Sequence, residues 1–173
     1  GERKETSTEM GKGTLHKKDH KPTTLQVVVD LKRLYCHSAK IMSNEKVFNP
    51  KNDFHNSTLI RINETLLDMF SKAFTANTIN VEKEPRLTGE RLALQRFAIE
   101  DARQLLAVFD LAKSQFHLPE RKFWNWMEML VEAKNKLVAW HKGDFERYGA
   151  NIDLSNQGGI GLNTRRQLSA AVC

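Results

Sequence analysis

The chain has 173 residues, 40% of them hydrophobic, so it is long enough for one domain with a core and too short for two comfortable ones. Its 27 Lys and Arg residues outnumber its 21 Asp and Glu residues, and the net charge of +6 favours an anionic partner. No run of about eighteen apolar residues and no apolar signal core occur, which predicts a soluble protein with no membrane role.

The first 22 residues combine Lys, Glu, Thr, Gly and His with almost no large apolar side chains. This composition predicts a flexible basic tail over residues 1–22. Within it, His16 and His20 have the spacing of a helical metal pair. No helix pattern supports them and no further ligands converge, so we favour a solvated tail and expect neither metal nor cofactor.

Residues 23–143 contain four segments in succession whose apolar residues recur at the three-and-four spacing of an amphipathic helix. The first begins near Thr23 and ends near Asn44. Proline disfavours helix at the residue before it, so Pro50 ends the pattern, and Asn52 or Asp53 can cap the second helix. That helix is expected to end at residue 77.

The third helix is expected to begin near Thr88 and to reach Phe116. The fourth follows after Pro119, which suits the first turn of a helix, and is expected to stop at Gly143. Short connections favour antiparallel neighbours. The predicted fold is therefore an all-α, antiparallel, up-down four-helix bundle over residues 23–143.

Three side chains of these segments carry more specific expectations. Asp101 falls on the apolar stripe of the third helix beside Phe97, where an unpaired carboxylate is costly, so we expect an ion pair with an arginine rather than a catalytic role. Val138 is assigned to the buried stripe of the fourth helix. Cys36 lies beside the first stripe and is expected to be a small buried thiol rather than a nucleophile.

Residues 144–173 contain Gly158, Gly159 and Gly161 among scattered Asn, Gln and Ser, and predict a C-terminal tail without periodic apolar positions. These glycines follow no strand and open no clear helix, so a phosphate-binding loop is disfavoured. The second cysteine is Cys173. Two cysteines are too few for the disulfide framework of a secreted domain, and we expect a cytoplasmic protein.

The sequence offers little to an enzyme. The usual hydrolase elbow, His-Glu-x-x-His, Cys-x-x-Cys and the Glu-x-x-His pairs of dinuclear iron bundles are absent. Small helical ribonucleases of prokaryotic defence systems place an arginine four to six residues before a histidine. The nearest pair here is Arg33 and His37, with three residues between them. We therefore expect no catalytic residues.

Basic side chains on the third and fourth helices are more informative, because several lie off the apolar stripes. Lys and Arg can hold a nucleic-acid backbone without reading its sequence. Interleaved glutamates leave open an ordinary charged helix surface. The candidate nucleic-acid-binding residues are Arg91, Arg96, Arg103, Arg121, Lys122, Lys134, Lys136 and Lys142.

Short motifs in order along the chain carry a resemblance to a known family. They are Leu34-Tyr35, the corner Phe48-Asn49-Pro50-Lys51, the helix end Ala73-Phe74-Thr75-Ala76-Asn77, the long third helix, and Leu137-Val138-Ala139-Trp140-His141-Lys142. Residues 23–143 thereby resemble the four-helix family of ribosomal-RNA intervening-sequence proteins and accessory variability determinants of diversity-generating retroelements. The family usually has a direct Phe-Pro corner, whereas Asn49 intervenes here.

The resemblance implies a non-catalytic accessory subunit. Members of the accessory branch form pentameric barrels with basic surfaces, and they associate with a reverse transcriptase and its template RNA, or an RNA/DNA hybrid, during complementary-DNA synthesis. A homopentamer would multiply +6 per chain to about +30 and strengthen binding to a polyanion.

Tryptophans bear on assembly as well. Trp124, Trp126 and Trp140 cannot all occupy one narrow stripe, so at least one is expected to be available for a subunit interface. Packing within the bundle is the alternative for each. The alternative for the whole protein is a helical interaction or scaffold module without a nucleic-acid role.

Overall fold

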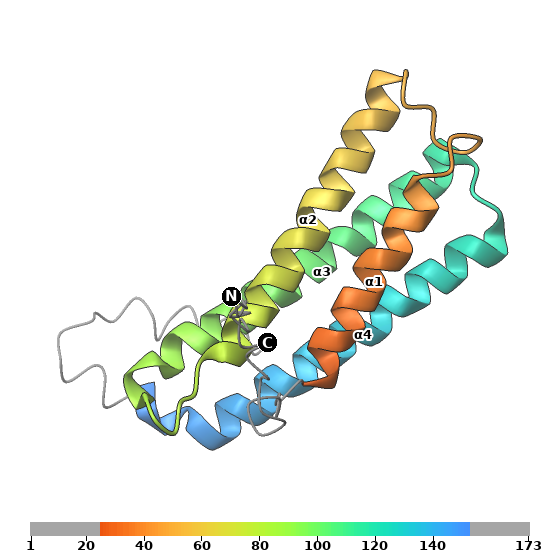
Figure 1. The fold of residues 1–173 in the computed structure, drawn as a ribbon. Coiled ribbons are helices and arrows are strands. Elements are labelled where there is room, and N and C mark those ends of the chain that lie inside the picture. The colour runs from red at the N-terminus through yellow and green to blue at the C-terminus, as the bar shows by residue number, and fades with distance from the viewer. Residues whose placement is uncertain (1–24, 153–173) are drawn as a thin grey trace, which may run out of the picture.

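The computed structural model describes residues 25–152, which form four long helices joined by short connections (Figure 1). Their bounds, with one 3-10 turn, are α1 Gln26–Met42, α2 Asp53–Thr78, η1 Pro85–Leu87, α3 Thr88–Phe116 and α4 Glu120–Tyr148. No strand occurs within this described range, so the predicted all-α class is confirmed.

Successive helices run in opposite directions and pack against each other, and α4 closes the arrangement against α1 (Figure 1). Tyr35 of α1 donates a hydrogen bond to Asn63 of α2 at 3.1 Å, and Thr58 of α2 bonds Gln115 of α3 at 2.8 Å. This is the predicted up-down bundle. Because α1 has 17 residues and the other helices have 26 to 29, one end of the described structure contains three helices.

The core joins α4 to α1 through a buried tryptophan. Trp126 is fully buried, and its ring lies 3.9 Å from that of Phe109, measured between centroids. Its indole N–H donates to Ser38 Oγ at 2.7 Å, and Ser38 donates to the carbonyl of Leu34 at 2.7 Å. A buried indole N–H needs a partner, so this chain of hydrogen bonds fixes the position of α1 on α4.

The helix ends follow local rules where polar side chains are present. Asn52 caps α2, because its side-chain oxygen accepts from the backbone N–H groups of Phe54 at 3.0 Å and His55 at 3.3 Å. At the end of α3, His117 adopts a left-handed conformation with φ of 51°. That residue lets the chain reverse over a very short connection before Glu120 begins α4.

The helix end predicted at Gly143 is wrong. The α4 helix continues to Tyr148, and Ile152 just beyond it packs against Leu92 of α3. Glycine inside a helix costs about 1 kcal/mol relative to alanine, but the next residue, Asp144, is buried and bonded to α3, which holds this turn helical. The remaining tail residues, 153–173, lie outside the described range, as do residues 1–22 and the expected start of the first helix at Thr23.

Several smaller expectations also differ from the structure. Phe97 is 41% exposed and Val138 is 40% exposed, and Cys36 is exposed instead of buried. Phe97 and Val138 lie at the margin of their apolar stripes, where the spacing of the sequence does not separate core from surface. Cys36 lies two residues from buried Leu34 and from buried Ser38, so it is on the far side of α1 from the core, and its expected burial is wrong. Asp101 does form the expected ion pair, but its partner is Lys72 of α2 at 2.7 Å and not an arginine.

Candidate nucleic-acid interface

A buried polar cluster, formed by Arg91, Gln95, His141 and Asp144, connects α3 to α4 at the three-helix end. Asp144 accepts from Arg91 Nε at 2.7 Å and from Gln95 Nε2 at 2.6 Å. Arg91 also donates to the carbonyl of Ile79 at 2.7 Å, in the loop after α2. Gln95 is fully buried and Asp144 is 3% exposed. These bonds satisfy a buried carboxylate and tie three segments together.

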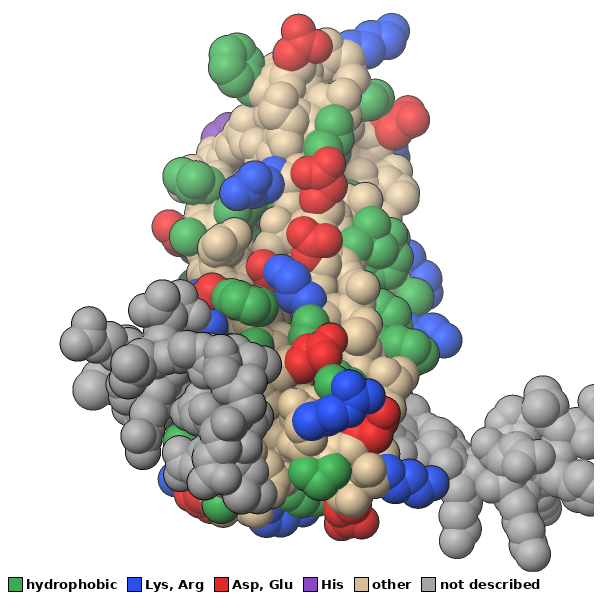
Figure 2. Space-filling model, turned by 90° about the vertical axis from the view of Figure 1, so that its left-hand side faces the viewer, with side chains coloured by type: hydrophobic (Ala, Val, Ile, Leu, Met, Phe, Trp, Pro, Cys, Tyr) green, Lys and Arg blue, Asp and Glu red, His purple; other side chains and the backbone are tan. Residues whose placement is uncertain are grey.

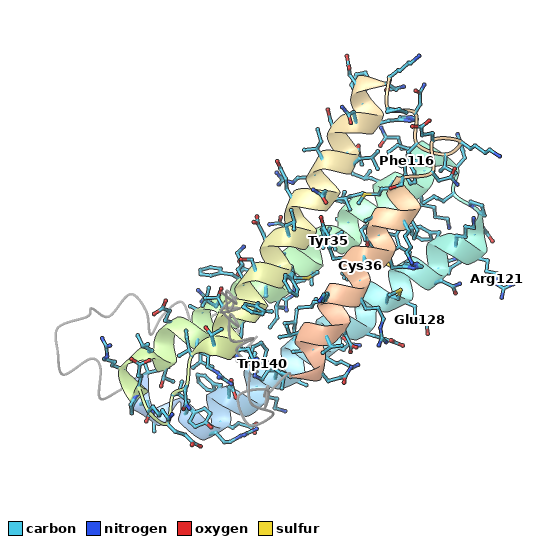
Figure 3. All side chains as sticks on the ribbon, in the orientation of Figure 1. Tyr35, Cys36, Phe116, Arg121, Glu128 and Trp140 are labelled. Atoms are coloured by element: carbon cyan, nitrogen blue, oxygen red, sulfur yellow. The ribbon has the colours of Figure 1, made fainter. Side chains whose placement is uncertain are left out.

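Two side chains of α4, His141 and Trp140, contact the residues that bond Asp144. His141 Nδ1 lies 3.2 Å from Gln95 Oε1. Burial and the positive charge of Arg96 lower the pKa of His141, and Asp144 partly opposes them. Trp140, labelled in Figure 3, places its ring 5.4 Å from the guanidinium carbon of Arg91, within the range of a cation–π contact.

Two of the eight predicted nucleic-acid-binding residues are therefore engaged within the fold. Arg91 belongs to the polar cluster, and its side chain is only 15% exposed. Lys136 forms an ion pair with Asp30 of α1. A phosphate could reach Arg91 only by competing with a buried carboxylate, so neither residue presents a free cation.

The outer edge between α3 and α4 carries a different pattern. Trp124, Val131, Val138 and Phe145 recur every seven residues on α4, and all but the half-buried Val131 are exposed. The register places this row on the side of α3, because Lys113 of α3 lies over the Trp124 ring at 4.9 Å.

Basic side chains flank this row. Lys134 and Lys142 lie one helical turn from members of the row on α4. On α3, Arg96 is half-buried and near His141, with its guanidinium carbon 5.0 Å from the Phe97 ring. Arg103 follows two turns later and is exposed. We define the α3–α4 edge by the apolar row together with Arg103, Lys134 and Lys142.

The other two predicted residues lie in the first turn of α4, where Arg121 precedes Trp124 of the apolar row by one helical turn. Arg121, labelled in Figure 3, is exposed in the first turn. Lys122 lies beside α1 and lines a cavity there. The eight predicted residues are thus divided: Arg91 belongs to the polar cluster, Arg96 lies near His141, Arg103, Lys134 and Lys142 belong to the α3–α4 edge, Lys122 and Lys136 lie beside α1, and Arg121 lies in the first turn of α4.

Basic side chains do not cover the whole surface. Figure 2 shows the side of the bundle that faces left in Figure 1, where acidic side chains run down the middle with basic and hydrophobic ones beside them. This mixed surface matches the ordinary charged helix surface left open by the sequence. Any preference for a polyanion must come from particular edges of the bundle.

A second apolar row lies on α2, and neither this row nor the one on α4 was predicted from the sequence. Ile60, Leu67 and Phe74 recur every seven residues on α2 and are exposed. Ile60 and Leu67 lie one helical turn from Asn63, which bonds Tyr35, so these two residues place the α2 row on the side of α1. The seven-residue spacings on α2 and α4 are visible in the sequence and could have revealed both rows.

Residues 25–152 contain neither a cluster of metal-ligand side chains nor a helix that could span a membrane. In this part of the chain, no three His, Cys, Asp or Glu side chains come together as a metal site would require. None of the described helices combines the length and apolar character needed to cross a bilayer.

Comparisons with family models, with curated proteins and with solved structures found no match.

Proposed function

We propose that the protein is a non-catalytic, nucleic-acid-binding accessory subunit of a reverse transcriptase complex of the diversity-generating retroelement type. The proposal rests on the family resemblance and on one structural observation, the α3–α4 edge. Along that edge, three cations, Arg103 of α3 and Lys134 and Lys142 of α4, lie beside the apolar row. Lys and Arg neutralise phosphates without reading sequence, so these cations suit the backbone of a template RNA or of an RNA/DNA hybrid, while the apolar row is left for a contact between subunits.

A homo-oligomeric ring, with a pentamer as the specific form, belongs to this proposal. The α2 row lies on the α1 side of the bundle, and the row on α4 lies on the α3 side. Since the helices pack in cyclic order, these edges are on opposite sides. Two different surfaces that pair head to tail generate a ring when the rotation closes. Exposed Trp124 fits the expected tryptophan of a subunit interface.

Light scattering tests the assembly. The unmodified protein should have a multiple of the 19.9 kDa chain mass at micromolar concentration. Leu67→Lys places a charge in the α2 row and should lower the mass, whereas Arg61→Ala, on an exposed position of the same helix outside that row, should leave it unchanged. A monomeric unmodified protein would contradict the ring.

RNA binding is tested with the triple variant Arg103→Gln, Lys134→Gln and Lys142→Gln, which spares Arg91 because its removal would disturb the fold. For each cation that binds a phosphate, the substitution should reduce the slope of log affinity against log salt by about 0.7 to 0.9. The charge-matched control is Lys32→Gln, Lys46→Gln and Lys83→Gln, three exposed lysines off this edge. Equal RNA affinity for both variants would move the RNA-binding surface elsewhere.

A helical interaction or scaffold module is the second candidate, and the two exposed apolar rows favour it. Both rows could serve protein contacts alone, with the net charge serving solubility. The distinguishing result is the behaviour of the unmodified protein. If it shows no salt-sensitive RNA affinity, alone or with its polymerase, the scaffold function replaces the accessory function.

A further inference from the structure

A cavity lies at the end of the bundle opposite the polar cluster, between the last turn of α1, the loop that follows it and the first turns of α4. Its volume is about 260 Å³. Ile41, Val47 and Leu118 supply its apolar part, and Leu118 is 7% exposed. Ligand pockets for cofactors and drug-sized molecules usually measure ~300–1,000 Å³, so this cavity is near the lower end of that range.

Some polar side chains that line the same cavity are basic and the others are uncharged amides, and none is a carboxylate. Lys40 on α1 and Lys122 on α4 contribute ammonium groups, and His37 contributes an imidazole. Asn44 and Asn125 contribute carboxamides. Across the described residues, neither lysine forms an ion pair, in contrast to Lys136, which lies further along the same two-helix junction.

The C-terminal carbonyls of α1 would repel an anion if they pointed freely into this region. Two of them accept hydrogen bonds beyond the helix: the N–H of Ser43 donates to Ala39 at 3.0 Å and the N–H of Asn44 donates to Ile41 at 3.2 Å. The first turn of α4 contributes the positive end of its helix dipole beside Lys122. With two lysines and no carboxylate in its lining, the cavity suits an anionic group.

We propose that this cavity binds a nucleoside phosphate, either a free nucleotide or one unpaired nucleotide of a bound RNA. The apolar residues Ile41, Val47 and Leu118, with the His37 imidazole, suit the face of a base. Asn44 Oδ1 accepts from the Lys46 N–H at 3.2 Å, so Asn44 offers its amide N–H groups to the edge of the base and Asn125 offers its whole carboxamide. Lys40 and Lys122, from opposite walls, hold the phosphate. Figure 3 shows Arg121, the residue before Lys122, at this end of α4.

This site is separate from the α3–α4 edge, because the cavity lies on the α1 side of α4. The inference goes beyond the proposed function and does not depend on it. Lys122 was a candidate for backbone binding, and the structure places it in a cavity with its own base-sized apolar floor. The cavity adds recognition of a single nucleotide to a surface that otherwise offers only backbone contacts.

Calorimetric titration of the full chain with adenosine 5′-monophosphate, adenosine and inorganic phosphate tests the site directly. We expect saturable binding of the nucleotide with one site per chain, and weaker binding of adenosine and of phosphate. The variant Lys40→Gln with Lys122→Gln should weaken nucleotide binding at least about tenfold, because it removes both charge-assisted hydrogen bonds to the phosphate. The charge-matched control, Lys32→Gln with Lys83→Gln, should bind as the unmodified chain does.

A second variant fills the cavity without changing its charge. Asn125 is exposed on α4, so Asn125→Trp should leave the helical circular dichroism unchanged while it abolishes nucleotide binding. Phosphate binding as tight as nucleotide binding would overturn the proposal, as would nucleotide binding that survives both the double lysine variant and Asn125→Trp.

A short single-stranded oligoadenylate distinguishes the two sources of the ligand. If an unpaired RNA nucleotide occupies the cavity, Asn125→Trp weakens oligonucleotide binding in parallel with mononucleotide binding. If the cavity takes free nucleotides, mononucleotide binding alone is abolished. The α3–α4 edge variant should retain mononucleotide binding in either case, so failure at the cavity and failure at the edge are separate results.

Discussion

The two ends of the bundle use polar side chains in opposite ways. At the three-helix end, Asp144 accepts two side-chain hydrogen bonds, and the arginine that donates one of them also bonds a loop carbonyl. At the other end, Lys40 and Lys122 line a cavity and form no ion pair within residues 25–152. Paired polar groups inside the fold stabilise it, while unpaired ones on a cavity wall are available to a ligand.

The largest expected effect removes the centre of the polar cluster. Asp144→Ala leaves Arg91 and Gln95 buried without their shared acceptor, and should lower the free energy of unfolding by about 3–5 kcal/mol in denaturant melts. The control is Glu146→Ala, an exposed residue of the same helix, with an expected change within about 0.5 kcal/mol. Equal midpoints would show that the cluster does not stabilise this end.

The middle of the bundle supplies the reference for both ends. Leu66→Ala in α2 or Leu130→Ala in α4 should cost about 2–5 kcal/mol, because both side chains are buried, at 1% and 0% exposed. Lys136→Ala should change stability by at most about 1 kcal/mol, since its ion pair with Asp30 lies at the surface. Denaturant midpoints that do not separate the leucines from the lysine would contradict the assigned core.

A smaller effect is expected at the turn beside the cavity. His117 has φ of 51°, a conformation that glycine adopts without the steric cost of a Cβ atom. His117→Gly should therefore raise the free energy of unfolding by about 0.5–1 kcal/mol, measured by thermal or denaturant melting. Ser114→Gly, inside α3, should have the opposite sign because glycine weakens a helix interior.

The smallest effect concerns pH and the polar cluster. Burial lowers the pKa of His141 below its ordinary value of 6.5, so the unfolded chain binds this proton more readily than the folded one. The free energy of unfolding should therefore rise with pH in the interval just below 6.5, and this contribution should be lost as pH falls through the same interval. Chemical denaturation between about pH 7.5 and about pH 5.5 measures this slope.

A paired variant makes the pH experiment specific. His141→Gln should flatten the slope, and His117→Asn, at an exposed histidine whose left-handed conformation asparagine tolerates, should leave it unchanged. An identical slope for His141→Gln and the unmodified chain would assign the pH dependence to another group.

Much of the fold was predictable because each helix has its own local signals. Asn52 caps α2 as the sequence indicates, and Pro119 directly precedes α4. The helix stop at Gly143 failed because a tertiary contact decided it: the bond between Asp144 and Arg91 spans 53 positions of sequence. Local glycine chemistry cannot report such a contact.

The candidate site was predictable only in part. Basic residue types are visible in the sequence, but their partners are not, so Arg91 and Arg103 look alike until the first is found bonded to Asp144. The row on α4 that starts at Trp124, with one apolar residue every seven positions, is visible in the sequence. It is hard to distinguish there from the core stripe, whose apolar residues recur every three and four positions. The cavity beside Lys122 depends on how the end of α1, the loop after it and the start of α4 are placed relative to one another. No spacing in the sequence predicts that arrangement.

The cyclic packing order of the helices also bears on how the chain folds. Neighbours in sequence are neighbours in space for three of the four helix contacts, and only α1 against α4 joins the chain's distant parts. The Trp126–Ser38 bond closes a separation of 88 residues and the Lys136–Asp30 pair one of 106. Because closing a long loop costs more entropy than forming a helical hairpin, we expect the contacts between successive helices to form first and the α1–α4 contact to form last. The cavity lined by α1 and α4 exists only once that final contact is complete.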